Sequence, residues 1–180
     1  MKEIRIHGRG GMGAVKAAEA LVYAAVMDGK YGNSIPFFGF ERQGAPVTAF
    51  IRISDEPIRR KNRVVNPDIV MVLDPTIMNA TNVFEGICDD SVFILNTKQD
   101  LSDLNIPPQI KMAALVDATA VALNTIGRPI TNTAMLGALC KATGLVSIDK
   151  VAQKVGELWG DKNVESLYQG YQQVTVTERK

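Results

Sequence analysis

Residues that commonly bind metals are scarce in this sequence. Its 180 residues include one histidine, His7, and two cysteines, Cys88 and Cys140, which stand far apart in the chain. Without a C-x-x-C motif, the chain alone is not expected to hold a zinc ion or an iron–sulfur cluster, and we interpret both cysteines as small buried or half-buried apolar residues. A single histidine excludes a multi-histidine metal site, and His7, at the end of an expected strand, is interpreted as structural. The sequence therefore predicts neither metal ligands nor catalytic residues in this chain.

An excess of charge of one sign and long hydrophobic runs are also lacking. The 20 Lys and Arg residues nearly balance the 19 Asp and Glu residues, so no overall field attracts nucleic acid or an acidic membrane. No apolar run is long enough to span a bilayer, and the residues after Met1 do not resemble a signal peptide. The hydrophobic fraction of 46% is sufficient for a core. We expect a soluble cytoplasmic protein of one domain that binds neither nucleic acid nor a membrane.

Hydrophobic patterning indicates strands and helices in a mixed order. Strands are expected at 3–7, 34–40, 46–54, 68–74, 91–96 and 110–116, the last three as the apolar runs typical of central parallel strands. Helices are expected at 14–28, from Asp117 to Gly127, at 131–144, from Ser147 to Gly160, and after a cap at Asn163. Gly137 lies inside one of these helices, where a neighbouring backbone is expected to approach closely. The expected fold class is α/β: a Rossmann-like, mostly parallel sheet with at least one antiparallel strand, flanked by helices, with a helical C-terminal third.

A glycine-rich loop joins the first expected strand to the first expected helix. Its glycines are Gly8, Gly10, Gly11 and Gly13, and three of them match G-x-G-x-x-G. Glycine permits a tight turn and leaves no Cβ between backbone N–H groups and an anion at a helix N-terminus, and Arg9 adds a cation. A nicotinamide site also requires an acidic residue after the second strand, but Glu41 comes late and a glycine–proline turn follows it. The loop is therefore interpreted as facing a phosphate, or else as only a tight strand-to-helix turn.

A second unusual stretch, "FFGFERQGAP", follows the second expected strand. Arg42 lies in a glycine-bounded turn, where it either forms a surface ion pair with Glu41 or is presented to an anion or another chain. Large apolar patches are uncommon on free monomers. The aromatic side chains of this turn therefore predict an interface, for which the candidate residues are Phe37, Phe38, Phe40, Glu41 and Gly44.

Four segments together resemble one protein family. The segments are "HGRGGMGAVKAAEAL", "PFFGFERQGAPVTAFIRI", "PDIVMVLDPTI" and "VDATAVALNTIGRPITNTAMLGALCKATGLVS". They are similar to the gamma subunits of 2-oxoacid:ferredoxin oxidoreductases, most of all to the pyruvate type, and the resemblance runs from about residue 2 to about residue 172. One departure is Met12, which stands where the family usually has glutamine. The resemblance implies a single gamma-type domain over residues 1–172, and residues 173–180 are expected to form a frayed tail.

The resemblance also implies a role within a larger enzyme. Such enzymes reversibly convert pyruvate, coenzyme A and oxidised ferredoxin to acetyl-CoA, CO₂ and reduced ferredoxin. The resemblance implies thiamine diphosphate, Mg²⁺ and [4Fe–4S] clusters on partner subunits (alpha, beta and delta), with contact to ferredoxin through the complex. This chain is expected to be inactive alone and to help hold coenzyme A, a substrate, by its phosphates; the candidate contacts are Gly8, Arg9, Gly10, Gly11, Gly13 and Arg42.

Several alternatives to this assignment stay open. One is the gamma subunit of a sister enzyme for 2-oxoglutarate or another 2-oxoacid. Another is a purely structural subunit with no ligand contact, and a third is an independent nucleotide-dependent enzyme that uses the glycine loop. The predicted interface contacts either the thiamine-binding subunits or, when the chain is expressed alone, a second copy in a homodimer.

Overall fold

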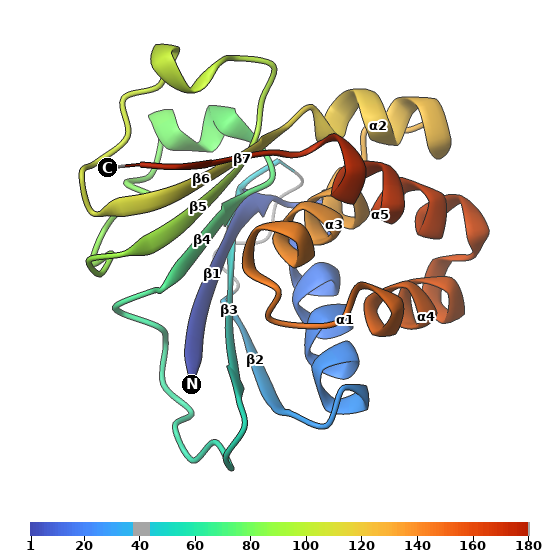
Figure 1. Ribbon diagram of the computed structural model, residues 1–180, viewed down its shortest axis with the longest axis horizontal. Helices are drawn as coiled ribbons and strands as arrows, with labels where there is room; N and C mark the ends of the chain where they lie inside the picture. Colours follow the sequence, from blue (N-terminus) through green and yellow to red (C-terminus); the bar gives the residue numbers. More distant parts are fainter. Residues whose placement is uncertain (38–43, 180) are drawn as a thin grey trace.

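Seven strands form one mixed sheet in the computed structural model, which describes residues 1–37 and 44–179 (Figure 1). The strand order across the sheet is β2-β3-β1-β4-β5-β6-β7. β3 and β7 are antiparallel to their neighbours and the other strands share one direction, so the expected mostly parallel sheet with antiparallel members is confirmed. The bounds are β1 Lys2–Arg9, β2 Tyr31–Phe37, β3 Pro46–Ser54, β4 Ile69–Val72, β5 Ser91–Asn96, β6 Ile110–Val116 and β7 Thr175–Glu178.

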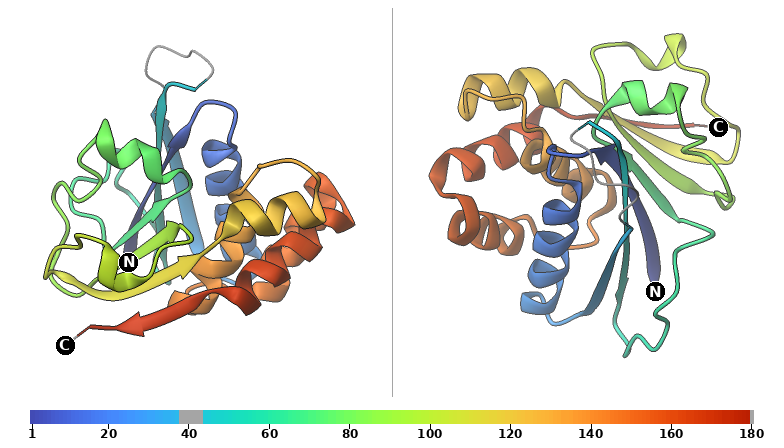
Figure 2. Two further views of the ribbon diagram at one scale, coloured as in Figure 1. Left: turned by 90° about the horizontal axis from the view of Figure 1, so that it is seen from above. Right: turned by 180° about the vertical axis from the view of Figure 1, so that it is seen from behind.

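The α-helices gather on one face of this sheet, whereas short 3₁₀ turns and loops lie on the other (Figures 1 and 2). Four helices, α2 to α5, follow one another between β6 and β7, which confirms the helical C-terminal third. Asp117 caps α2 by accepting a hydrogen bond from Ala120 N, and Ser147 and Gly160 flank α4, as expected. The bounds are α1 Ala14–Met27, α2 Ala118–Thr125, α3 Asn132–Thr143, α4 Ile148–Trp159, α5 Asp161–Gln173, η1 Pro75–Asn79 and η2 Leu101–Asp103.

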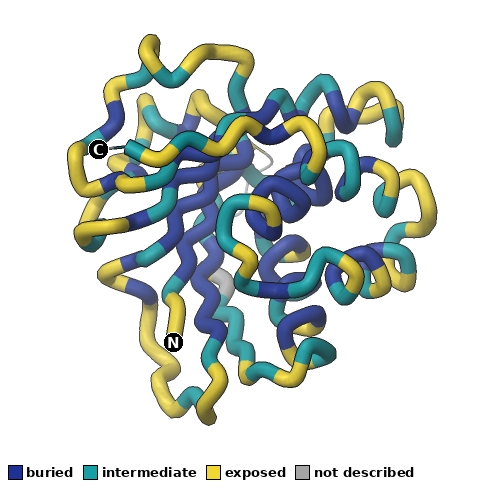
Figure 3. The backbone as a smooth tube through the Cα atoms, viewed as in Figure 1, coloured by how far each residue is buried: buried dark blue, intermediate teal, exposed yellow. Residues whose placement is uncertain are grey.

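Two hydrophobic clusters bury the two faces of the sheet (Figure 3). Successive side chains of a strand point to opposite faces. On β1, Ile4 and Ile6 therefore pack into the cluster beneath the helices, while Arg5 and His7 point to the other face. The strand is buried on both sides, yet only one of its faces is apolar.

Two helices of the C-terminal region touch backbone to backbone. A Cβ added to Gly137 of α3 would overlap with the Leu167 carbonyl oxygen of α5, and a Cβ added to Gly170 of α5 would overlap with the Ala134 carbonyl oxygen of α3. The expectation of a close backbone approach at Gly137 is thereby confirmed. Only residues without a side chain allow helices to pack at this separation.

The structure corrects two expectations about the C-terminal end. Residues 175–178 do not fray but form β7, which pairs with β6 from Leu115↔Thr175 to Met112↔Glu178. The reason is that the β6 edge would otherwise leave backbone groups unpaired, and the alternating Thr and Val residues of β7 suit a strand. Arg179 extends the contact by donating to the carbonyl oxygens of Pro107 and Ile110, at 2.8 and 3.1 Å. The last helix also begins at Asp161, directly after Gly160, and not after a cap at Asn163.

Candidate functional site

The glycine-rich loop lies between β1 and α1, as its sequence predicts. Gly11 and Gly13 have φ angles of +93° and +80°, which side-chain-bearing residues rarely adopt. Gly10 N donates to Ala45 O at 2.8 Å, and Gly44 N donates to Gly10 O at 3.1 Å. The loop is thus bonded to the start of β3, and the second glycine-bounded turn ends directly beside it.

The first turn of α1 is available to an anion. Ala17 N is bonded to the carbonyl oxygen of Gly13, the N-cap, so the N–H groups of residues 14–16 have no acceptor within the helix. No side chain caps this end, and the first turn holds no acidic residue. A Cβ added to Gly11 would have no atom within 4 Å. Backbone donors and the positive end of a helix dipole therefore follow closely after the open Cβ position of Gly11.

Arg9 ties this loop to the end of the next strand. Its Nε donates to the Asp74 carboxylate at 2.9 Å, its Nη2 to Thr76 Oγ1 at 2.8 Å, and its Nη1 to Gly44 O at 3.0 Å. Asp74 also accepts from Thr76 N at 2.9 Å and so caps η1. A guanidinium has five N–H groups, so these bonds leave donors for a further acceptor.

Sequence reasoning missed three residues that shape this region. Asp74 and Thr76 hold Arg9. Asn132 of α3 fills the space behind the loop, since a Cβ added to Gly13 would lie 2.6 Å from its Nδ2. The position of Asp74 at the carboxyl end of a parallel strand, where ligands of open α/β sheets usually bind, was a signal that could have found it.

The predicted interface residues are only partly described. Phe38, Phe40, Glu41 and Arg42 lie outside the described residues. The side chain of Phe37 is 45% exposed and packs against Phe50 and beneath the Arg63 guanidinium, whose carbon lies 5.3 Å from the ring centroid. Gly44 is exposed with φ +85° and lies beside the glycine loop.

The cysteines and the histidine are not arranged as a metal site. Among residues 1–37 and 44–179, no three His, Cys, Asp or Glu side chains cluster as ligands. Burial raises the pKa of the Cys140 thiol to about 12, so it stays protonated, and Cys88 is half-buried. His7 is buried, and this burial, reinforced by the nearby Arg5, lowers the pKa of its imidazole to about 3.

We expect His7 to make folding stability depend on pH. Its pKa in the folded chain lies below the ordinary value of 6.5. As the pH falls, His7 is therefore protonated in the unfolded chain before it is protonated in the folded chain. The contribution of His7 to the free energy of unfolding is fully present above about pH 6.5. It decreases as the pH falls toward about pH 3, by up to ~1.4 kcal/mol per pH unit. Denaturant titrations at pH 7 and pH 4.5 should show the loss, and the His7→Gln variant should lose about 2 kcal/mol less. An equal loss in both proteins would contradict the assignment.

The part of the chain that the structure describes contains no helix long and apolar enough to cross a membrane.

Comparison with known proteins places the chain in a family. The model of the pyruvate ferredoxin/flavodoxin oxidoreductase family matches residues 3–173. The chain belongs to this family. The Pyrococcus furiosus "pyruvate/ketoisovalerate oxidoreductases common subunit gamma" is 46% identical to this chain, and the match covers 99% of this chain and 100% of the relative. The "pyruvate synthase subunit PorC" of Methanothermobacter thermautotrophicus is 48% identical over 97% of this chain and 96% of its own.

A solved structure shows the same fold. The crystal structure of the pyruvate oxidoreductase subunit PORC from Thermotoga maritima superimposes with a TM-score of 0.87 at 37% identity, covering 98% of each chain. The resemblance to gamma subunits of this oxidoreductase family is therefore confirmed over nearly the whole chain.

Proposed function

We propose that this chain is the gamma subunit of a pyruvate:ferredoxin oxidoreductase, which reversibly converts pyruvate, coenzyme A and oxidised ferredoxin to acetyl-CoA, CO₂ and reduced ferredoxin. The observation that carries the proposal is the end-to-end match, at 46–48% identity, to curated subunits of such enzymes. The alpha, beta and delta subunits supply thiamine diphosphate, Mg²⁺ and the [4Fe–4S] clusters, and ferredoxin reacts with the complex. This chain supplies binding surface and no acid–base or redox group.

We propose that the other subunits of the enzyme select the 2-oxoacid substrate. The name of the Pyrococcus relative gives one gamma subunit to both a pyruvate and a ketoisovalerate oxidoreductase. A subunit shared between two such enzymes does not select between their substrates. A sister enzyme for another 2-oxoacid therefore remains the second candidate, and a complete complex assayed with each 2-oxoacid distinguishes the two.

The glycine loop is proposed to bind the phosphates of coenzyme A in the assembled enzyme. The N–H groups at the start of α1, the open space at the Cβ position of Gly11, and the remaining donors of Arg9 support this assignment. The Cβ positions of Gly8 and Gly13 face Leu73 and Asn132 inside the protein. Arg42 is proposed as a further contact from the neighbouring turn. Holding the thiol-bearing substrate near the thiamine-bound intermediate would lower the barrier by proximity and orientation.

The topology around the loop disfavours a nicotinamide site. In a dinucleotide-binding unit, the strand after the first helix lies parallel and adjacent to the first strand. Here the strand after α1 is β2, which lies at the sheet edge and pairs antiparallel with β3. The position from which an acidic residue would reach the ribose is therefore displaced. The isolated chain is expected to show no micromolar binding of NAD or NADP.

Assembly is expected to depend on the turn that Phe37 begins. Truncating a central aromatic anchor of an interface costs about 2 kcal/mol, or roughly thirtyfold in affinity. We expect Phe37→Ser to weaken binding to the thiamine-binding subunits, or self-association of the chain alone, by about that factor. Leu123→Ser, which removes a comparably exposed apolar side chain from α2, should have little effect. Sedimentation and pull-down with both variants test this, and equal affinities for the two variants would refute the interface.

The purified chain is expected to contain no iron. Cys88 and Cys140 cannot supply the four thiolates of a cluster. Iron and sulfide analysis of the isolated chain, together with its visible spectrum, tests this. Stoichiometric iron and sulfide with broad absorbance near ~400 nm would show that the cluster assignment to partner subunits is wrong.

A further inference from the structure

The connection between β3 and β4 concentrates positive charge on the surface. Residues 55–68 run over the sheet face opposite the α-helices, and most of their side chains are exposed (Figure 3). Positions 55–63 hold four Lys or Arg and two Asp or Glu side chains, an excess of two positive charges, whereas the whole chain has a formal net charge of +1. We call residues 59–63 the cationic loop; its exposed cations are Arg59, Arg60, Lys61 and Arg63.

A buried arginine holds the backbone of the cationic loop. Arg52 of β3 is 2% exposed, and its Nη1 and Nη2 donate to the carbonyl oxygens of Asn62 and Arg63 at 2.6 and 3.3 Å. Glu3 lies opposite Arg52 on β1, and its carboxylate accepts from Arg52 Nε at 2.6 Å and so neutralises the buried charge. A buried ion pair is costly to desolvate. This one serves to fix two carbonyl groups of an exposed loop.

The neighbouring strand adds a second anchor. Asn33 lies opposite Arg52 on β2, and its Nδ2 donates to the carbonyl oxygen of Arg60 at 3.3 Å. Directly after the loop, the side chain of Val64 is 2% exposed. The backbone of the cationic loop is therefore fixed to the sheet at several points while its charged side chains face outward. A surface that is arranged before binding loses less conformational entropy when a partner docks.

The charges of the cationic loop are not used within the described chain. None of its Lys or Arg side chains forms an ion pair with a described Asp or Glu. This holds even for Asp55 and Glu56, which belong to the same connection. Glu85 lines one pocket together with Arg63, but its charge acts on the buried Arg5. Exposed charges add little to folding stability, so those of the loop remain available to a partner.

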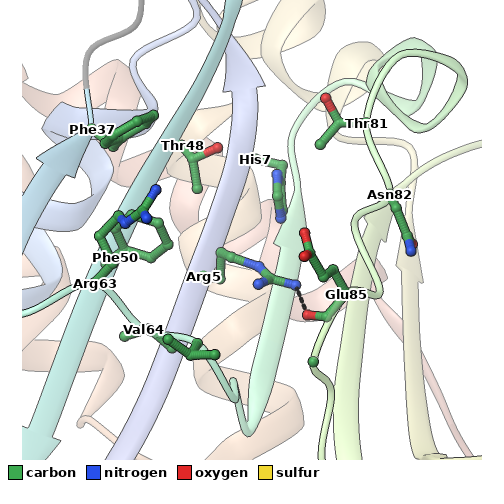
Figure 4. A pocket seen from close by; sticks show the side chains of 12 residues that line it. Arg5, His7, Phe37, Thr48, Phe50, Arg63, Val64, Thr81, Asn82 and Glu85 are labelled. Carbon is green, nitrogen blue, oxygen red and sulfur yellow. Dashed lines mark hydrogen bonds between the residues drawn. The ribbon is translucent and has the colours of Figure 1, made fainter.

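The cationic loop lies beside the predicted subunit interface. The guanidinium carbon of Arg63 is 5.3 Å from the ring centroid of Phe37 (Figure 4). Phe37 is 45% exposed, ends β2 and begins the aromatic turn that is predicted to contact other subunits. Protein interfaces commonly combine an apolar centre with a polar rim. The cationic loop has the position and the chemistry of such a rim.

We propose that the cationic loop docks against an acidic surface of a partner subunit and steers assembly of the complex. This inference rests on the proposed function, because the partner belongs to the assembled oxidoreductase. A second copy of the chain is disfavoured, since a symmetric contact brings the same patch of both copies together and two cationic loops repel each other. The nearly neutral overall charge also gives nucleic acid no general attraction to the chain.

Association kinetics with a complex of the remaining subunits test the proposal. The association rate of the unaltered chain should fall between about 0.01 M and about 0.15 M salt, because the screening length shortens from ~30 to ~8 Å. The double variant Arg59→Glu/Arg60→Glu should associate about tenfold more slowly at the lower salt concentration and lose most of the salt dependence. The dissociation rate should change less, because rim charges act mainly on the encounter.

A second double variant controls for net charge. Arg128→Glu/Lys162→Glu makes the same change in charge at two exposed cations, one between α2 and α3 and the other in α5. Its association rate should differ from that of the unaltered chain by less than about twofold, because its altered charges lie on the helical side of the sheet. Both double variants alter exposed side chains, and circular dichroism checks that each is folded.

Several results would overturn the proposal. The first is an association rate of the unaltered chain that does not depend on salt, and the second is equal slowing by the two double variants, which would reduce the effect to net charge. The third is an effect of the loop variant only on the KM for ferredoxin or on binding of single-stranded DNA. Failure of the chain to associate at any salt concentration would refute the proposed function as well. Normal association of the loop variant beside weakened binding of Phe37→Ser would refute this inference alone.

Discussion

Gly137→Ala is expected to lower the free energy of unfolding by about 3 kcal/mol or more, although alanine favours helices. The added methyl group would overlap with the Leu167 carbonyl oxygen. This oxygen belongs to the backbone of α5 and cannot rotate away as a side-chain atom could. α3 and α5 would have to separate, which would disturb the packing of Met135, Leu136 and Leu167. Gly170→Ala should have a similar effect, because its methyl group would meet the Ala134 carbonyl oxygen from the other helix. Chemical denaturation followed by circular dichroism measures both changes.

The matched control lies in α4. A Cβ added to Gly156 would meet only the Val164 side chain, at 3.3 Å, and this side chain can shift. Gly156→Ala gains helix propensity and is expected to change stability by less than about 1 kcal/mol. If Gly137→Ala and Gly156→Ala unfold at the same denaturant concentration, the close contact of the two helix backbones does not exist in solution.

Gly11→Val is expected to raise the KM for coenzyme A of the assembled enzyme by about tenfold to a hundredfold. The side chain would enter the open space beside the α1 N-terminus and hold an anion away from its N–H groups. Decarboxylation of pyruvate up to the thiamine-bound intermediate needs no coenzyme A and should be unchanged. Arg42→Ala, which removes one proposed charge-assisted hydrogen bond, should give a smaller increase in the same constant. Steady-state and single-turnover kinetics on the reconstituted complex separate these effects.

Gly29→Val controls for backbone strain. Gly29 also has a positive φ and open space at its Cβ position, but it follows the opposite end of α1. Both valine variants therefore carry a similar conformational cost of about 1–2 kcal/mol, and only Gly11→Val obstructs the proposed site. If the two variants assemble normally and show the same KM for coenzyme A as the unaltered enzyme, the glycine loop serves only chain geometry, and the structural-subunit alternative is favoured.

The sequence predicted those features that depend on local patterns. The apolar runs at β4, β5 and β6 and the glycines around α1 have signatures within a few residues, and the expected elements were found there. The close backbone approach at Gly137 was predictable because glycine disfavours a helix interior, so a neighbouring segment has to explain its presence there. The bonds from Arg9 to Asp74 and Thr76 join residues 65 and 67 positions apart, and no periodicity reveals such a pair.

Residues on β1 and β7 show why the rest was not predictable. Arg5 and His7 alternate with isoleucines, which on a half-exposed strand indicates a solvent-facing side. The loop of residues 55–68 and the segment around Thr81–Glu85 surround that side, and so the polar residues are buried. Likewise, the residues of β7 are polar enough to fray, and only the free edge of β6, formed far earlier in the chain, makes them a strand. Burial of this kind depends on distant segments that a local pattern does not encode.

The pairing of β7 with β6 has a consequence for biosynthesis. Among the strands of the sheet, translation delivers the interior strand β1 first and β7, at one edge, last. Until β7 leaves the ribosome, the β6 edge of the nascent chain presents unpaired N–H and C=O groups, which are a template for aberrant strand addition. A stalled or prematurely terminated chain would keep this edge open permanently. β7 thus completes the sheet and at the same time protects the newly made chain from aggregation.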